Sequence, residues 1–122
     1  MFPSMPAAGC PPAGDRGAVT VEAALALCAL TVFLTMAVGA VAAAGAAVRC
    51  TDAARELVRL AARSEADRGR TVAADLAPAG SAVQLDQTGD LLTGVVSVRL
   101  VPLLPITVSG RSVGAVEPGS AP

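Results

Sequence analysis

Few side chains in this sequence could carry out chemistry, and their types and spacing do not form a catalytic set. The chain contains no His, which excludes Ser/His/Asp and Cys/His nucleophiles, and it has no phosphate-binding glycine loop. Glu56, Glu65 and Asp67 have the spacing of a solvated helix face rather than that of a paired acid and base. We therefore expect neither an enzyme nor a bound cofactor.

The three cysteines, at positions 10, 28 and 50, do not have the spacing of metal ligands, so no metal site is predicted. Cys28 falls inside a long apolar run, where a small buried hydrophobic side chain is the simplest interpretation. Cys50 follows that run and could form an intermolecular disulfide if it lies outside the cytoplasm.

The composition of the chain argues against several function classes. Its 122 residues allow one small domain at most. Nine arginines against ten acidic residues give a net charge of −1, which does not attract nucleic acid. Aromatic residues make up only 2% of the chain, so Ala, Val and Leu carry the apolar character and close helix packing is expected.

The chain divides into a leader, a membrane helix and a polar C-terminal part. Residues 1–17 are rich in Pro and Gly and read as a disordered leader. The 26 residues from Ala23 to Val48 carry no charge and, at about 1.5 Å per residue, exceed the ~30 Å hydrocarbon core of a bilayer. Gly39 and Gly45 are the candidate helix-packing positions, because small residues let helices approach closely in lipid.

An amphipathic extension should continue the membrane helix, so that one helix covers residues 18–66. The apolar residues of one face are Ala53, Leu57, Leu60 and Ala61. The opposite face carries Asp52/Arg55 and Glu56/Arg59 at i,i+3 spacing. Gly69 is the expected terminator. Residues 67–80 are then a linker with one short helical turn at Thr71–Ala77, ended by Pro78–Gly80.

Residues 81–117 have the pattern of a small β-rich region. Val83 and Leu85 alternate with polar residues, and the "TGD" of Thr88–Asp90 indicates a tight hairpin turn. Leu91–Val101 is the partner strand, with Val96, Val98 and Leu100 on one face. A third strand is expected at Ile106–Val116, where Gly110 would allow a bulge or a register change. Residues 118–122 read as a disordered tail. The predicted fold class is α+β.

Glu22 is the exception in the apolar run, within "RGAVTVEAAL" at Arg16–Leu25. A carboxylate at the centre of a bilayer costs roughly 2.5–3.5 kcal/mol on insertion scales, and such residues are usually paired or functional. An interfacial position at the helix start would lower that cost, and the helix dipole would favour the anion by about 0.3–1 kcal/mol. From Glu22 alone both interpretations stay open.

The residues around Glu22 resemble a known processing signal. Cleavage after Gly17 would make Ala18 the first residue and Glu22 the fifth. A charged leader that ends in Gly, followed by an apolar helix with Glu at position five, resembles the class III leader and N-terminal helix of type IV pilins and pseudopilins. More closely, "RGAVTVEAALAL" (Arg16–Leu27), "RCTDAARELVRLAAR" (Arg49–Arg63) and a short β-rich tail resemble the TadE-like minor pilins of tight-adherence (Flp) pilus systems, in their short actinobacterial form.

This resemblance covers most of residues 16–116 and implies a membrane-anchored pseudopilin that takes part in assembly of an Flp/Tad type IV pilus or a related secretion apparatus. It implies that a prepilin peptidase cleaves after Gly17 and that Glu22 is the assembly carboxylate. The new α-amino group of Ala18 could pair with Glu22 of a neighbouring subunit. The implied partners are the membrane, other pilins or pseudopilins, the pilus assembly machinery and the peptidase.

The pilin orientation places the C-terminal region of a single-pass cell-membrane protein outside the cytoplasm. Only Arg16 precedes the helix, whereas six arginines follow it from Arg49 to Arg70, and the positive-inside rule favours the reverse orientation. Because acidic residues alternate with those arginines and the resemblance of the leader is specific, we expect the pilin orientation.

Two other interpretations remain. Leu25–Val38 could be the apolar part of an ordinary signal peptide, with "AVA" at Ala40–Ala42 as the cleavage site of a small secreted protein. The chain could also be an uncleaved single-pass membrane protein whose C-terminal helix faces the cytoplasm and binds a partner there.

Overall fold

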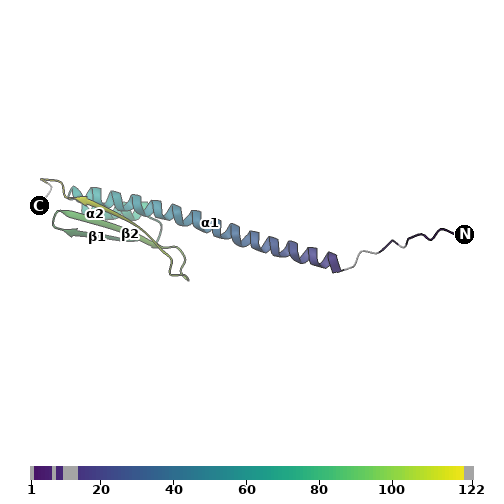
Figure 1. Cartoon of the computed structure of the whole chain (residues 1–122). Helices are drawn as coiled ribbons and strands as arrows, with labels where there is room; N and C mark the ends of the chain where they lie inside the picture. The colour runs from purple at the N-terminus through teal and green to yellow at the C-terminus, as the bar shows by residue number, and fades with distance from the viewer. Residues whose placement is uncertain (1, 7, 10–13, 120–122) are drawn as a thin grey trace. The chain divides into compact units, whose positions relative to one another are not determined.

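The computed structural model describes residues 2–6, 8–9 and 14–119, and it confirms the α+β class (Figure 1). The elements follow in the order α1 (Gly14–Ala62), α2 (Ala66–Leu76), β1 (Ala82–Thr88), β2 (Leu91–Arg99) and β3 (Thr107–Ala115). The chain forms two compact units, Met1–Val38 and Gly39–Pro122, which are described separately below.

The N-terminal unit contains the first half of α1. Residues 2–6 and 8–9 of the expected leader form neither helix nor strand, and residues 1, 7 and 10–13 lie outside the described part of the chain. Helix α1 begins at Gly14 rather than at residue 18. Asp15 in the first turn complements the partial positive charge of the helix N-terminus, which accounts for a start before the apolar run.

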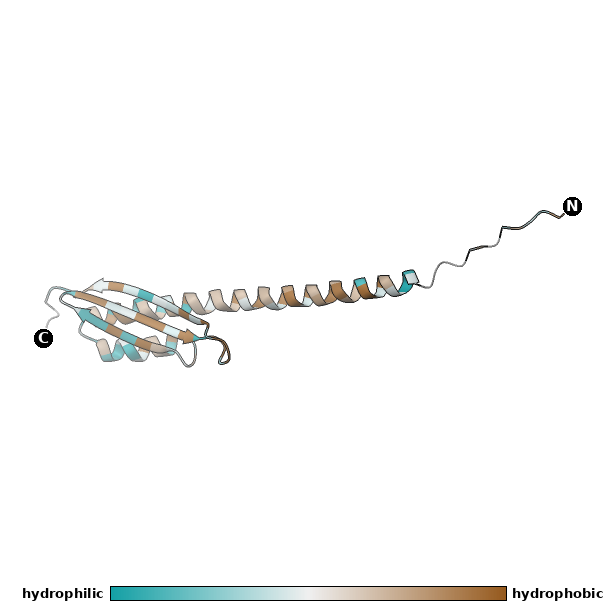
Figure 2. Cartoon of the chain, turned by 60° about the horizontal axis from the view of Figure 1, so that its bottom comes forward, coloured by the Kyte–Doolittle hydropathy of each residue, from teal (hydrophilic) through white to brown (hydrophobic). Residues whose placement is uncertain are grey.

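The C-terminal unit is an antiparallel sheet in the order β1-β2-β3, with one face against the helices. Val96 of the central strand pairs with Val83 on one side and Gly110 on the other. The even-numbered residues Leu92 to Val98 are buried and the odd-numbered residues face away, an alternation visible along the strands in Figure 2. The predicted inward positions Val83, Val96 and Val98 are confirmed.

The predicted hairpin turn is also confirmed. Thr88 pairs directly with Leu91, which leaves Gly89 and Asp90 as a two-residue loop. Gly89 has φ +60°, whereas Asp90 does not have positive φ. Positive φ at the first central position alone is the pattern of a type II′ turn, which requires Gly there.

Glycines in the sheet let α1 approach the strands closely. A Cβ built on Gly94 would lie 3.2 Å from the carbonyl oxygen of Ala54, and one on Gly114 would lie 2.5 Å from Val58 Cγ1. At Gly110 the added atom would overlap the backbone of Cys50 and Thr51. The prediction of a bulge at Gly110 is wrong, because pairing of β2 with β3 continues in register through this residue. Gly110 is instead a contact point for the helix.

The helix extension ends earlier than expected, at Ala62 rather than at residue 66. Ser64 has φ +65°, and its N–H donates to Ala61 O while the N–H of Glu65 donates to Leu60 O. This pair of hydrogen bonds is a Schellman motif, which stops a helix at a left-handed residue. The backbone N–H of Glu117 also donates to Ala62 O, so the end of the sheet caps α1.

The expected linker contains a second helix. Helix α2 spans Ala66–Leu76, so Gly69 lies inside a helix and does not terminate one. A Cβ on Gly69 would lie 3.1 Å from Leu57 O and 3.3 Å from Leu60 Cβ. Gly69 is therefore the position at which α2 crosses α1, a contact between distant residues that the local sequence does not reveal. The predicted break at Pro78–Gly80 follows the end of α2.

The amphipathic extension has the predicted faces. The four predicted apolar residues are all buried: Ala53, Leu57, Leu60 and Ala61. On the other face Arg55 lies 3.6 Å from Asp52, and Arg59 donates to both carboxylate oxygens of Glu56 at 2.9 and 2.6 Å. The hydrogen bonds from the Arg59 guanidinium lower the pKa of the Glu56 carboxyl. Both pairs lie on the solvent-facing side of the helix, with Glu56 half-buried, and contribute little to stability.

The contact at Gly110 predicts a large effect of a single methyl group. Gly110→Ala should lower the free energy of unfolding by about 1–3 kcal/mol or more. The added methyl group would overlap backbone atoms, and a side-chain rotation cannot relieve that overlap. Denaturant unfolding of the full chain in detergent, followed by circular dichroism, measures this change.

Gly45→Ala is the matched control, since a Cβ at Gly45 has no heavy atom within 4 Å and Ala favours the helix. Equal stability of Gly110→Ala and the parent chain would contradict the close approach of β3 to α1.

Candidate functional site in the apolar helix

The apolar part of α1 presents hydrophobic side chains to its surroundings on all sides. An 18-residue stretch within Gly14–Ala62 has a mean hydropathy of 2.3, and none of it is buried by the rest of the described chain. Val19, Leu25 and Phe33 are each more than 60% exposed. The helix is therefore long and apolar enough to span a membrane, as the sequence predicts.

The hydroxyl groups in this segment have partners within the helix itself. Thr20 Oγ1 donates to Arg16 O at 3.0 Å, Thr31 Oγ1 to Leu27 O at 2.8 Å, and Thr35 Oγ1 to Thr31 O at 2.8 Å. These bonds remove the cost of placing a hydroxyl group in an apolar medium. The threonines therefore need no partner from another chain.

Glu22 differs from the threonines. Its side chain is exposed among apolar neighbours, and within the part of the chain that the structure describes it has neither a hydrogen bond nor an ion pair. Among the threonines and the glutamate between residues 18 and 48, Glu22 alone lacks a partner in the described part of its own chain. Removal of its carboxylate from water is also the most costly, because this group is charged. The structure thus leaves a carboxylate on an apolar helix that can be satisfied only from outside the described chain or at the interface with water.

The predicted processing position lies just before Glu22. Gly17 and Ala18 are in the second turn of α1, and a Cβ on Gly17 would meet no heavy atom within 4 Å. The first turn of a helix has N–H groups without intrahelical partners and frays most readily. A protease could therefore reach this bond after the unwinding of a short end segment.

The two candidate packing glycines do not share a face of α1. Gly39 and Gly45 are both exposed, with no heavy atom within 4 Å of a built Cβ. Six residues of α-helix place them about 120° apart around the axis. A single neighbouring helix could therefore pack on one of them but not on both.

Cys50 has a structural position rather than a reactive one. It is 0% exposed and belongs to the core cluster with Ala46, Ala53 and Val96. Burial raises the pKa of its thiol, and the nearby positive charge of Arg49 only partly opposes this. The suggestion that Cys50 forms an intermolecular disulfide is wrong for the folded chain, because the sheet covers the sulfur.

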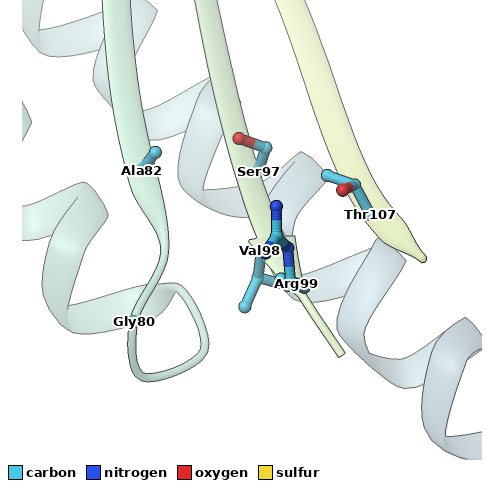
Figure 3. Close-up of a pocket in the computed structure, with 6 residues that line it drawn as sticks. All are labelled: Gly80, Ala82, Ser97, Val98, Arg99 and Thr107. Atoms are coloured by element: carbon cyan, nitrogen blue, oxygen red, sulfur yellow. The ribbon is translucent and has the colours of Figure 1, made fainter. Parts of the chain in front are cut away.

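A second group of polar side chains lies at one end of the sheet (Figure 3). Ser97 and Arg99 of β2, with Thr107 of β3 and Gly80 and Ala82, surround a shallow hollow of about 230 Å³. The sequence does not reveal this hollow, because its residues come from three separated segments. The described residues contain no cluster of His, Cys, Asp or Glu that could hold a metal, and this hollow offers only one guanidinium and two hydroxyl groups.

These features define a small α+β protein whose folded C-terminal unit follows an apolar helix with a single unpaired carboxylate. The chain is 36% identical over 100 residues to the apoptosis inhibitor Rv3655c of Mycobacterium tuberculosis, a match that covers 82% of this chain and 80% of the relative. It belongs to the same family as that protein. No protein-family model matches the chain, and no solved structure matches it.

The burial of Cys50 predicts protection from thiol reagents. In a chain with Cys10 and Cys28 replaced by Ser, Cys50 should react with a maleimide only after unfolding, because its sulfur is covered and its raised pKa disfavours the thiolate. Mass spectrometry of the folded and the denatured protein after labelling measures the difference. Rapid labelling of the folded chain would contradict the packing of β3 over this residue.

Proposed function

We propose that this protein is a membrane-anchored minor pilin or pseudopilin of the TadE-like type, which takes part in assembly of a type IV (Flp/Tad) pilus or a related secretion apparatus. A prepilin peptidase cleaves it after Gly17, and Glu22 is its assembly carboxylate. Its partners are other pilins or pseudopilins, the pilus assembly machinery and the peptidase. It has no catalytic role of its own.

The observation that carries this proposal is the lone carboxylate at Glu22. A charged group without a partner on an apolar helix is costly in lipid, whereas a pair of opposite charges with good geometry is tolerated. Cleavage after Gly17 creates a new α-amino group at Ala18, four residues before Glu22. In a bundle of such helices, this amine of one subunit would satisfy the Glu22 carboxylate of another and set the axial register between them.

The folded unit also supports the outward orientation of the C-terminal region. Residues 49–122 follow the apolar run, and segments longer than about 60 residues translocate largely regardless of charge. Arg55, Arg59 and Arg63 each lie within 4 Å of an acidic side chain, and the same is true of two arginines of α2. These arginines belong to a folded surface rather than to a juxtamembrane cluster.

A second candidate function follows from the place where the sheet begins to cover α1. Ala43 is half-buried and Ala46 is buried, whereas Val41 and Ala42 are exposed. Signal-peptide cleavage after Ala42 would therefore release the folded unit almost whole. The relative is named an apoptosis inhibitor, and a secreted unit with that activity is the alternative to a pilus subunit.

The mature N-terminus separates these candidates. Intact mass and N-terminal peptide mapping of the protein recovered from membranes and medium should give a chain that begins at Ala18. A start at Ala43 would establish the secreted form, and an intact Met1 would leave an uncleaved single-pass protein. Gly17→Ala is not a suitable control, because Ala is also small; Gly17→Leu should abolish the cleavage.

Removal of the carboxylate should affect assembly and leave insertion intact. Glu22→Ala should reach the membrane fraction normally, because it removes a polar group from the apolar segment. Its co-purification with pilus subunits should fall by two orders of magnitude or more, since breaking a buried ion pair costs about 3–5 kcal/mol. Quantitative pull-down from the source organism measures this loss.

Thr31→Val is the matched control in the same segment, because the Thr31 hydroxyl is already satisfied by Leu27 O. Undiminished recovery of partners with Glu22→Ala would exclude the assembly role of this residue.

A further inference from the structure

The loop between β2 and β3 is an exposed apolar segment of the C-terminal unit. Residues 100–106, "LVPLLPI", carry no charged or polar side chain. Leu103 is 95% exposed, and Leu104 and Ile106 are about half exposed. Figure 2 shows this loop as an apolar tip that extends past the end of the sheet. An exposed apolar tip of this kind marks an interaction surface.

The loop lies at the end of the C-terminal unit that is nearer to Gly39, the first α1 residue of this unit. Gly114 of β3 contacts Val58, and Gly110 contacts Cys50 and Thr51, so β3 and α1 run in the same direction. Val108 packs on the cluster that includes Ala46. The residues before Thr107 therefore lie on the Gly39 side of Val108, at the level of the α1 residues 39–45.

The length of the apolar run places the edge of a bilayer at the level of the β2–β3 loop. The charge-free run Ala23–Val48 has 26 residues, about six more than the roughly 20 that a span needs. The folded unit begins to cover one face of α1 at Ala43, with Ala46 buried and Ala43 and Ala47 half-buried, so residues 43–48, which contain this contact, account for those six. The 20 residues from Ala23 to Ala42 remain for lipid, and the sheet then begins where the hydrocarbon ends.

The backbone of the loop suits a medium with little water. Of its seven residues two are prolines, which have no N–H. Three of the other five donate within the loop: Leu100 to Ile106 O, Leu104 to Val101 O and Ile106 to Leu104 O. An apolar environment penalises each unsatisfied backbone group by several kcal/mol, and among the N–H groups of the loop only those of Val101 and Leu103 form none of these bonds.

The charges at the base of the loop suit lipid headgroups. Arg99 directly precedes the loop, and Arg49 directly follows the charge-free run of α1. They are the only charged residues in 39–51 and 97–108. Cations at this level would lie among the phosphates of the lipid. The chain has no Trp or Tyr, so the usual aromatic residues that fix the depth of a membrane helix are missing.

From these observations we infer that the β2–β3 loop inserts its apolar tip, Val101–Ile106, into the lipid surface beside α1 and fixes the depth of the helix in the bilayer. The inference rests on the membrane anchoring assumed in the proposed function, but not on pilus assembly or on the orientation of the chain. It assigns a lipid contact to a loop whose sequence is otherwise unexplained.

Single tryptophans test this inference, because the natural chain has none. The full-length variants Leu103→Trp and Leu91→Trp are reconstituted into phosphatidylcholine vesicles with and without brominated acyl chains. Leu91 is a matched control, since it is also an exposed leucine but lies in the sheet at the far end of β2, about 26 Å along the strand from Arg99. Circular dichroism verifies that both variants fold.

The expected result is a blue-shifted tryptophan emission in the Leu103→Trp variant that brominated lipid quenches, with unquenched emission in the Leu91→Trp variant. Unquenched emission from Leu103→Trp in vesicles that hold the protein would overturn loop insertion and leave the anchoring intact. A blue shift without quenching would also overturn it and would indicate a protein partner on the loop. Equal quenching of both variants would overturn the specific role of the loop. If the protein does not float with the vesicles in a density gradient, both the membrane span and the inference are overturned.

Discussion

The close contact between residues 50–58 of α1 and the glycines of β2 and β3 is the interaction on which the C-terminal unit depends. With only two Phe residues and no Trp or Tyr in the chain, large side chains cannot fill a wide gap between helix and sheet. The core is built from Ala, Cys, Val and Leu, which fill the interior only if the backbones approach closely. Glycine on the sheet and small residues on the helix permit that approach, and dispersion contacts then form over the whole interface. The same requirement sets Gly69 at the crossing of α2 with α1.

Polar side chains find their hydrogen-bond and ion-pair partners in different ways in the two parts of α1. In the folded unit, charged residues lie on the exposed face of the helix in i,i+3 pairs, and the buried side-chain nitrogen and oxygen atoms of the described residues all have partners. In the apolar part, threonine hydroxyls bond to the backbone of their own helix. Glu22 has no such solution, because a carboxylate cannot donate to a carbonyl oxygen. In lipid, an unpaired carboxylate of this kind needs an ion-pair partner or a position at the interface with water.

The sequence predicts the structure correctly where the signal is local. The buried face of the extension follows from helical spacing of Ala53, Leu57 and Leu60, and the hairpin follows from the turn residues Gly89 and Asp90. The prediction is wrong where a residue serves a distant contact: the local sequence indicates a terminator at Gly69, a bulge at Gly110 and a single helical turn in place of α2. A glycine has the same appearance in sequence whether it relieves backbone strain or makes room for another element. For the candidate site, the sequence identified Glu22 and its neighbours, whereas the internal bonding of the threonines needed coordinates.

The order of the strands has a consequence for export. Strand β3 ends at Ala115, near the C-terminus, yet it supplies Gly110, whose contact with Cys50 spans sixty residues of chain. If the chain crosses a membrane after its apolar helix has been inserted, β3 is the last element to emerge. Until then one side of residues 50–58 is uncovered and β2 has a free edge, which is prone to wrong pairing. The loop closure between these segments comes late and is slow compared with helix formation. Completion of the fold therefore has to wait until β3 has crossed the membrane, and a chain stalled before that point would expose an uncovered helix face and an unpaired strand edge.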